Sequence, residues 1–227
     1  MTQAKNPKAT SKAAVGNKPL SARARSAQLT RDSVLKAAIK VFAKYGLNGG
    51  SIEKISSAAK SHDRMIYYYF GNKEGLFVAV LEETYRRFNE AEAKVEIDPK
   101  DPVLSLKKLV EFIVNYYHDH PEFVIILNSE NLHRGKHIAK SELAQEYSSK
   151  AISVFSEVLL AGQKKGVFRD DLSPRDLYMM VAAMGYFYQS NRYTLSAFLG
   201  EKLEKTETFS AWEQFVMDAV LRTVTTK

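Results

Sequence analysis

The stretch SIEKISSAAKSHDRMIYYYFGNKEGLF, residues 51–77, decides the fold of this chain. Ser51 and Asn72 are residue types that cap helix N-termini, and apolar residues recur at helical spacing after each of them. The pattern predicts two short helices within residues 51–70, joined by a turn of three or four residues, and another helix from Lys73. Two short helices joined by so short a turn are typical of a helix-turn-helix, whose second helix enters the major groove of DNA.

Upstream of this motif the sequence predicts one more helix and a basic arm. Thr30 can cap the helix, an apolar stripe runs from Leu35 to Phe42, and Gly46 suits a left-handed residue at its end. Residues 1–29 carry six Lys and Arg, no acid and few large apolar side chains, so we expect them to be mobile. The arm is either a solvated tail or an additional contact to phosphate through Arg23 and Arg25.

The run from Val34 to Phe77 resembles the DNA-binding domain of the TetR family of transcriptional regulators. Its most specific part is Tyr-Tyr-X-Phe-X-X-Lys-X-X-Leu, which starts at Tyr67. The resemblance implies a DNA-binding domain over residues 30–77, with its helix-turn-helix at 51–70, and a ligand-binding and dimerisation domain over 78–227. The turn departs from the family's usual Gly-Val-Ser, because it reads Lys60-Ser61-His62-Asp63.

The resemblance and the chemistry of the side chains together indicate a set of DNA contacts. Arg64 can pair with guanine or phosphate, and Met65 can touch a thymine methyl group. Lys73 and Ser51 stand at helix N-termini, which bind anions. Asp63 is unfavourable near phosphate unless it accepts from a cytosine amine. The predicted DNA-binding residues are Arg23, Arg25, Thr30, Ser51, His62, Asp63, Arg64, Met65, Tyr67, Tyr68 and Lys73.

The net charge agrees with a polyanionic partner at the N-terminal end. The chain of 227 residues carries +7, and residues 1–90 hold 16 Lys and Arg against 7 Asp and Glu. Residues 91–227 hold 17 against 19, which leaves them close to neutral. A positive field confined to one end indicates that this end meets the anion.

From residue 76 onward the apolar spacing stays helical, and no stretch alternates like paired strands. We therefore expect an all-α protein with about nine helices. The TetR resemblance implies that the last two helices pair with a second copy across a two-fold axis, as palindromic DNA requires. The alternative is that their apolar stripes close a monomeric core. The predicted interface residues are Met184, Tyr188, Phe209, Trp212, Phe215, Val216 and Val220.

The resemblance also implies that a small-molecule effector binds among the middle helices. Such a pocket is mostly apolar with a few well-placed polar groups, so its candidates are aromatic and polar residues on apolar helices. They are Tyr116, Tyr117, Phe123, Asn128, Asn131, Arg134, Tyr147, Tyr178, Tyr186 and Gln189.

Other classes of protein are disfavoured. The chain has no cysteine, its Gly49-Gly50 lacks the Lys-Ser/Thr of a phosphate loop, and no Gly-X-Ser-X-Gly occurs. Two histidine pairs, His118 with His120 and His133 with His137, have spacings that could share a metal ion. No carboxylate-rich motif completes a ligand set with either pair, so we expect no metal and no cofactor. No export signal or membrane span is expected, which favours a cytoplasmic protein.

These observations predict a homodimeric, ligand-responsive regulator, a repressor rather than an enzyme, that binds a palindromic double-stranded DNA operator and is released by an unknown small-molecule effector. Two alternatives stay open. One is a helical DNA-binding protein without a small-molecule ligand. The other is a helical binding protein that has lost operator binding, at which Asp63 hints.

Overall fold

The computed structural model describes residues 21–226, except for the side chains of residues 144, 145 and 147–149. Within this range the chain forms nine α-helices, one 3₁₀ helix and no strand apart from an isolated bridge, which confirms the all-α prediction. None of the described helices combines the length and apolarity needed to cross a bilayer. The elements are α1 (Ala22–Gly49), α2 (Ile52–Ala59), α3 (Asp63–Phe70), α4 (Lys73–Glu92), α5 (Pro102–Asp119), α6 (Pro121–Leu132), η1 (Ile138–Lys140), α7 (Ala144–Lys164), α8 (Pro174–Leu199) and α9 (Thr206–Val224).

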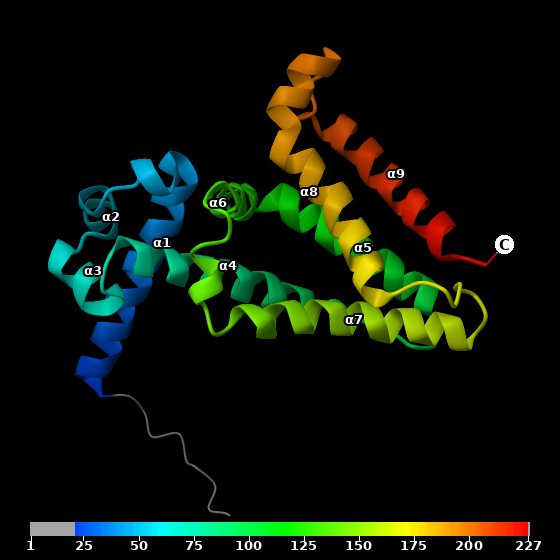
Figure 1. The fold of residues 1–227 in the computed structure, drawn as a ribbon, viewed down its shortest axis with the longest axis horizontal. Coiled ribbons are helices and arrows are strands. Elements are labelled where there is room, and N and C mark those ends of the chain that lie inside the picture. Colours follow the sequence, from blue (N-terminus) through cyan, green and yellow to red (C-terminus); the bar gives the residue numbers. More distant parts are fainter. Residues whose placement is uncertain (1–20, 227) are drawn as a thin grey trace, which may run out of the picture.

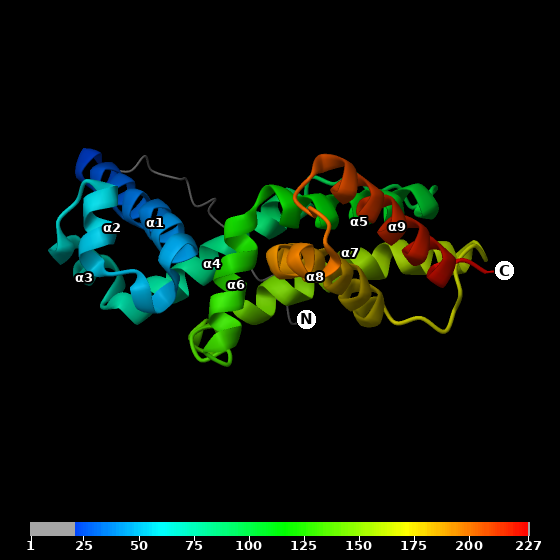
Figure 2. The ribbon, with the colours of Figure 1, turned by 90° about the horizontal axis from the view of Figure 1, so that it is seen from above.

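The helices form two bodies at opposite ends of an elongated molecule (Figures 1 and 2). Helices α1, α2 and α3 make the N-terminal body, whereas α5, α7, α8 and α9 pack together at the other end. Helix α4 begins in the first body and ends in the second, and α6 lies between them against α1.

The N-terminal core is built from the apolar faces that the sequence predicts. Ile55 of α2 and Ile66 of α3 are fully buried, and the rings of Phe42 and Phe77 meet edge to face at 5.3 Å. This core also takes in Leu81 of α4 and Ile126 of α6. The buried cluster thus continues past residue 77, the predicted end of the DNA-binding domain, into α4 and α6.

The start of the first helix also differs from the prediction. Helix α1 begins at Ala22, and the Ser21 hydroxyl caps it by accepting from the Ala24 N–H at 3.2 Å. Thr30 lies inside the helix, where its hydroxyl donates to the Ser26 carbonyl at 3.0 Å. Residues 22–29 are therefore helical rather than part of a mobile arm, because good helix formers follow an effective cap. The rest of the predicted arm, residues 1–20, lies outside the described residues.

The C-terminal core is rich in large aromatic and aliphatic side chains. Leu109 and Ile113 of α5 are fully buried at its centre, and α7, α8 and α9 all contact that helix. Gly185 of α8 lets the Tyr117 ring come close, because a side chain there would meet the ring at 3.0 Å. Helix α5 is thus the central helix against which the others pack.

Candidate DNA-binding face and effector core

The turn between α2 and α3 keeps a helix-turn-helix geometry without the glycine of the family pattern. Lys60 adopts the left-handed conformation with φ of 51°, and its N–H donates to the Ser57 carbonyl at 3.2 Å. The Ser61 N–H then donates to the Ser56 carbonyl at 2.9 Å. A lysine in this conformation costs roughly 1–2 kcal/mol relative to glycine. The hydrogen bonds hold the turn at the angle that glycine would otherwise allow.

The helices before and after α3 have the caps that the sequence predicts. The Ser51 hydroxyl accepts from the Lys54 N–H at 3.3 Å, and the Asn72 side chain accepts from the Gly75 N–H at 2.8 Å. His62 occupies the position before α3 but makes no side-chain capping hydrogen bond. His62 is exposed, so its ring can contact a groove or backbone beside α3.

Helix α3 turns one side inward and presents the other to solvent. Ile66 is fully buried, whereas Tyr67 and Tyr68 are 53% and 77% exposed. Arg64 is exposed and lies three and four residues before the two tyrosines, so the three side chains share one face. Asp63 and Met65 are half-buried at the flanks of this row. We call Arg64, Tyr67 and Tyr68 the reading row.

Two further lysines are fixed beside the reading helix. Lys73 Nζ donates to the Asn48 carbonyl at 3.3 Å, and Lys54 Nζ donates to the Gly49 carbonyl at 2.9 Å. The Lys54 ammonium also lies 4.6 Å from the centre of the Tyr45 ring. These contacts hold positive charge at the N-termini of α2 and α4, where a phosphate would be attracted. Sequence reasoning found Lys73 but missed Lys54 and Tyr45, although the lysine stands in the first turn after the Ser51 cap.

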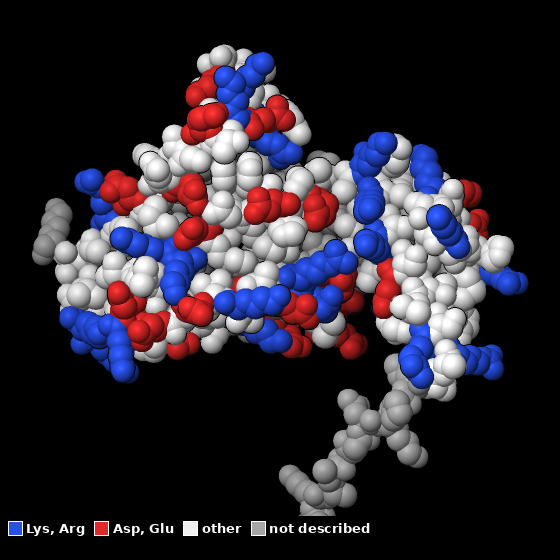
Figure 3. All heavy atoms as spheres, turned by 180° about the vertical axis from the view of Figure 1, so that it is seen from behind, with Lys and Arg blue, Asp and Glu red and all other residues white. Residues whose placement is uncertain are grey.

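The predicted DNA contacts in α1 differ in how exposed their side chains are. Arg23 and Arg25 are exposed in the first turns of the helix. Thr30 is half-buried and uses its hydroxyl inside the helix, so it is a weaker candidate for a phosphate contact. Figure 3 shows more Lys and Arg than Asp and Glu over the N-terminal body, and a mixture of both signs elsewhere on that view.

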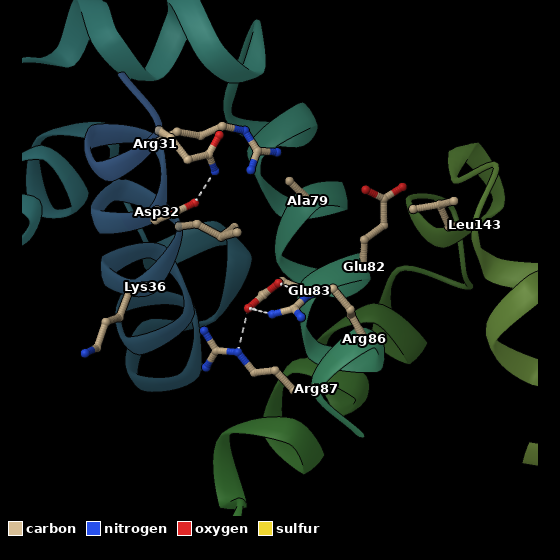
Figure 4. A pocket seen from close by; sticks show the side chains of 11 residues that line it. Arg31, Asp32, Lys36, Ala79, Glu82, Glu83, Arg86, Arg87 and Leu143 are labelled. Atoms are coloured by element: carbon tan, nitrogen blue, oxygen red, sulfur yellow. Dashed lines mark hydrogen bonds and ion pairs between the residues drawn. The ribbon is translucent and has the colours of Figure 1, made fainter. Parts of the chain in front are cut away.

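An open cleft of about 580 Å³ lies where the N-terminal body meets α4 (Figure 4). Arg31 and Asp32 come from α1, and Glu83 of α4 forms ion pairs with Arg86 and Arg87. Both walls are charged, so the cleft lacks the apolar lining expected of a small-molecule site. We regard it as the gap between two bodies rather than as an effector pocket.

The segment after α6, residues 133–140, is held against the N-terminal body. We call the contacts of Glu130 and His137 described here the Glu130 latch. The buried Glu130 carboxylate accepts from the His137 and Ile138 N–H groups at 2.7 and 2.9 Å, and its other oxygen lies 2.7 Å from His137 Nδ1. The His137 ring packs edge to face on Phe77 at 5.2 Å. On the surface, Glu74 pairs with two lysines of this loop, and these bonds lower its pKa to about 2.

Most of the predicted effector residues gather in the C-terminal core. Tyr116, Tyr117 and Phe123 are buried around the Phe88 ring, with ring centres 4.9, 6.2 and 5.5 Å from it. The Tyr178 ring meets Phe155 at 5.7 Å. Burial raises the pKa of Tyr178 to about 12, so its hydroxyl is neutral at ordinary pH.

The polar candidates are split between the core and the surface. The Tyr186 hydroxyl donates to Asn128 Oδ1 at 2.5 Å, and Gln189 is buried with its amide 3.0 Å from His118 Nδ1. Asn131 is exposed at the end of α6, but its side chain forms a hydrogen bond with Tyr186 at the border of the buried cluster. Arg134 is exposed in the turn after α6, away from that cluster. The side chain of Tyr147 lies outside the described residues.

Sequence reasoning missed one charged residue of this core. Glu92 closes α4 with only 3% of its surface exposed, and its Oε1 has no hydrogen-bond partner among the described residues. Burial raises its pKa to about 7. The sequence gives no signal for this burial, because Glu92 is one of several acidic residues near the end of a charged helix.

The residues of the predicted dimer interface differ in how much of their surface is exposed in one subunit. Four of its seven residues are buried inside their own subunit and have almost no surface left for a partner; they are Tyr188, Phe209, Val216 and Val220. Met184 and Trp212 are half-buried, and only Phe215 is well exposed. The apolar surface available instead includes Met179 and Phe187 of α8, which with Ala183 are spaced four residues apart on one face. An amphipathic stripe shows that a helix is covered, but not by which neighbour.

Comparisons with known protein families identify the class of protein to which this chain belongs. Residues 34–80 match the family described as bacterial regulatory proteins, tetR family, and residues 102–220 match the tetracyclin repressor-like C-terminal domain. The chain therefore belongs to the TetR family of transcriptional regulators.

Several known proteins are similar to this chain over most of its length. The chain is 52% identical over 200 residues to the HTH-type transcriptional repressor NicS of Pseudomonas putida, covering 88% of this chain and 94% of that protein. It is 28% identical over 162 residues to the HTH-type transcriptional repressor SCO4008 of Streptomyces coelicolor, covering 71% and 79%. The fold is similar to that of the fatty acid degradation regulator FadR from Bacillus halodurans, with a TM-score of 0.62, 23% identity and coverage of 84% and 97%.

Proposed function

We propose that this protein is a transcriptional repressor that binds a palindromic DNA operator as a homodimer and leaves it when a small molecule binds the C-terminal core. The observation that carries the proposal is the exposed reading row on the second helix of the helix-turn-helix. Membership in a family of regulators and the similarity to a named repressor support it. Operator DNA lies in the bacterial cytoplasm, so this function implies a cytoplasmic protein without a catalytic role.

In this proposal the reading row meets base edges and the surrounding residues meet phosphates. The Arg64 guanidinium can make two hydrogen bonds to guanine, and the Tyr67 and Tyr68 hydroxyls can donate to phosphate or bases. Ser51 and Lys73 contact phosphate at the starts of α2 and α4. Arg23 and Arg25 extend the phosphate contacts along α1, while His62, Asp63 and Met65 border the row.

Two copies are needed because a palindrome presents two half-sites about one helical turn, or a multiple of it, apart. We propose that the exposed face of α8 around Met179, Ala183 and Phe187, together with Phe215 of α9, forms the two-fold interface. This face is apolar and solvent-exposed in one subunit. Burial of such a face gives about 25 cal/mol per Å² of apolar surface.

Helix α4 supplies the link between effector and operator. It is one uninterrupted element of 20 residues, so it spans about 30 Å from Lys73 at the DNA end to Glu92 in the C-terminal core. A shift of its C-terminal end changes the spacing of the two reading helices. Because coupling is reciprocal, an effector that weakens operator binding binds the DNA complex more weakly by the same factor.

The test is a gel-shift titration with the DNA upstream of the protein's own gene. We expect a shift by the wild-type protein, a weaker shift after Tyr68→Ala, and a weaker and less sequence-specific shift after Arg64→Ala. Leu132→Ala is a matched control, because Leu132 is exposed but lies on α6 away from the reading row. A wild-type protein that binds this DNA no better than a scrambled duplex contradicts the proposal.

A further inference from the structure

The Glu92 carboxylate lies in an environment that disfavours its ionised form. It is 3% exposed, and its Oε1 has no hydrogen-bond partner in the part of the chain that the structure describes. No described cation forms an ion pair with it. It also stands in the last turn of α4, at the negative end of the helix dipole. Buried polar groups in folded proteins are almost always paired, so this unpaired oxygen is a candidate site for a partner from outside the chain.

The groups around Glu92 are neutral and aromatic. Burial raises the pKa of Tyr117 of α5 and Tyr178 of α8, and the charge of Glu92 adds a smaller rise to both. Tyr85 of α4 acts electrostatically on the same two hydroxyls, so the four groups belong to one region of the core. The Tyr117 ring lies 5.9 Å from the Tyr186 ring, nearly perpendicular to it. Aromatic faces carry negative charge density and attract cations and N–H groups.

We propose that Glu92 anchors the effector, and that the effector presents a hydrogen-bond-donating nitrogen, protonated or as N–H, on a small apolar or planar body. This inference rests on the proposed function, because it assigns the chemistry of the effector site. A protonated nitrogen favours the ionised form of Glu92, which only accepts hydrogen bonds, and a neutral N–H can donate to the carboxyl oxygens in either protonation state. A charge-assisted N–H···O bond in a dry site is among the strongest polar contacts available.

The position of Glu92 also explains how such a ligand would reach the DNA. Glu92 closes the helix that begins at Lys73, and the neighbouring Tyr117 and Tyr178 belong to α5 and α8. A donor placed between the carboxylate and these rings fixes the end of α4 against α5 and α8. The ligand thus stabilises one arrangement of α4 over others, which is the differential affinity that any effector needs.

The test compares three probes with the same ring: benzylamine, benzamide and N,N-dimethylbenzamide. The first carries a protonated amine, the second a neutral N–H donor, and the third has no donor. Each is titrated at millimolar concentration into the full-length protein while the melting temperature is measured. Four proteins are compared: wild type, Glu92→Gln, Glu92→Leu and the control Glu213→Gln. Glu213 is a half-buried glutamate of the same domain that already accepts from Asn115 Nδ2 at 2.5 Å.

We expect benzylamine and benzamide to raise the melting temperature of wild type and Glu213→Gln, and N,N-dimethylbenzamide to leave it unchanged. Glu92→Gln should weaken benzylamine binding about tenfold or more, and Glu92→Leu should abolish the response to both donors. Circular dichroism verifies that each variant is folded. An equal response to N,N-dimethylbenzamide, a donor response that persists in Glu92→Leu, or no response to any probe overturns the inference.

The outcome is separable from that of the proposed function. A wild-type protein that shifts operator DNA but shows none of the expected probe responses refutes this inference alone. A wild-type protein that binds benzylamine through Glu92 but fails to shift any upstream DNA refutes the proposed function and leaves the site chemistry intact.

Discussion

The pH dependence of stability offers a direct measure of the environment of Glu92, through the substitution Glu92→Gln. Burial raises the pKa of this carboxyl from 4.5 to about 7 in the folded protein. Between these two values the folded state holds a proton on Glu92 that the unfolded state has released. The free energy of unfolding therefore falls as the pH rises through this interval, and levels off above about pH 7.

The size of the effect follows from the same two pKa values. A pKa of about 7 against an ordinary 4.5 corresponds to a loss of about 3 kcal/mol across the interval. The groups that face the carboxyl from α5 and α8 are Tyr117 and Tyr178, whose raised pKa values keep them neutral throughout this range. Replacement by glutamine removes the titrating proton and keeps the shape, so this part of the pH dependence should disappear.

The measurement is urea unfolding of wild type and Glu92→Gln at about pH 5 and about pH 8, at a fixed protein concentration because a dimer's stability depends on it. We expect wild type to lose roughly 2.5 kcal/mol more than the variant between the two conditions. Glu204→Gln, an exposed glutamate, should follow wild type. Parallel pH profiles for wild type and Glu92→Gln would refute the argument, because they would show that Glu92 is solvated or paired.

Further predictions concern DNA, assembly and the latch. Arg64→Ala should weaken specific operator binding by roughly 1–3 kcal/mol in a sequence-dependent way; an equal loss on every duplex would restrict Arg64 to phosphate. Replacing both Arg23 and Arg25 with alanine removes four arginines from the dimer, so it should lower the slope of log affinity against log salt by about 4; an unchanged slope would remove them from the DNA contact. Phe187→Asp should give folded monomers in sedimentation experiments, whereas Val220→Asp should unfold the subunit because Val220 is fully buried; a Phe187→Asp dimer would move the interface elsewhere. Glu130→Ala should destabilise the protein to urea by roughly 3 kcal/mol, since it leaves one buried and one half-buried N–H group unpaired. Glu74→Gln, at an exposed pair, should change little.

Local chemistry in the sequence was sufficient to predict the N-terminal body. Ser51 and Asn72 cap the helices that the pattern predicts, and Gly46 takes the positive φ expected of a helix end. The start of α1 was missed because Ser21 and Thr30 are both good cap residues. The choice between them depends on the helix propensity of residues 22–29, which are mostly alanine, arginine, glutamine and leucine.

The candidate effector core and the interface could be predicted only in part. Periodicity identifies Val216 and Val220 as a stripe, but a stripe packs equally well on its own subunit or on a partner. Glu92 carries no distinguishing signal in the sequence, because α5 and α8 bury it only in the folded chain. Residues that depend on contacts between distant segments therefore need the structure.

The presence of Ile126 in the N-terminal core bears on how such regulators can be recombined. Ile126 belongs to α6, yet it is fully buried with residues of α1 to α4. If the N-terminal body were separated from the rest of the chain by a cut at any point along α4, it would lose the Ile126 side chain and the Glu130 latch. A chimeric sensor that joins this N-terminal body to the effector domain of another protein should therefore include residues 121–140. Otherwise the other domain must supply an apolar side chain of similar size in place of Ile126. For the same reason, operator specificity in this chain is easier to transplant by replacing the exposed side chains of α3 than by exchanging whole segments.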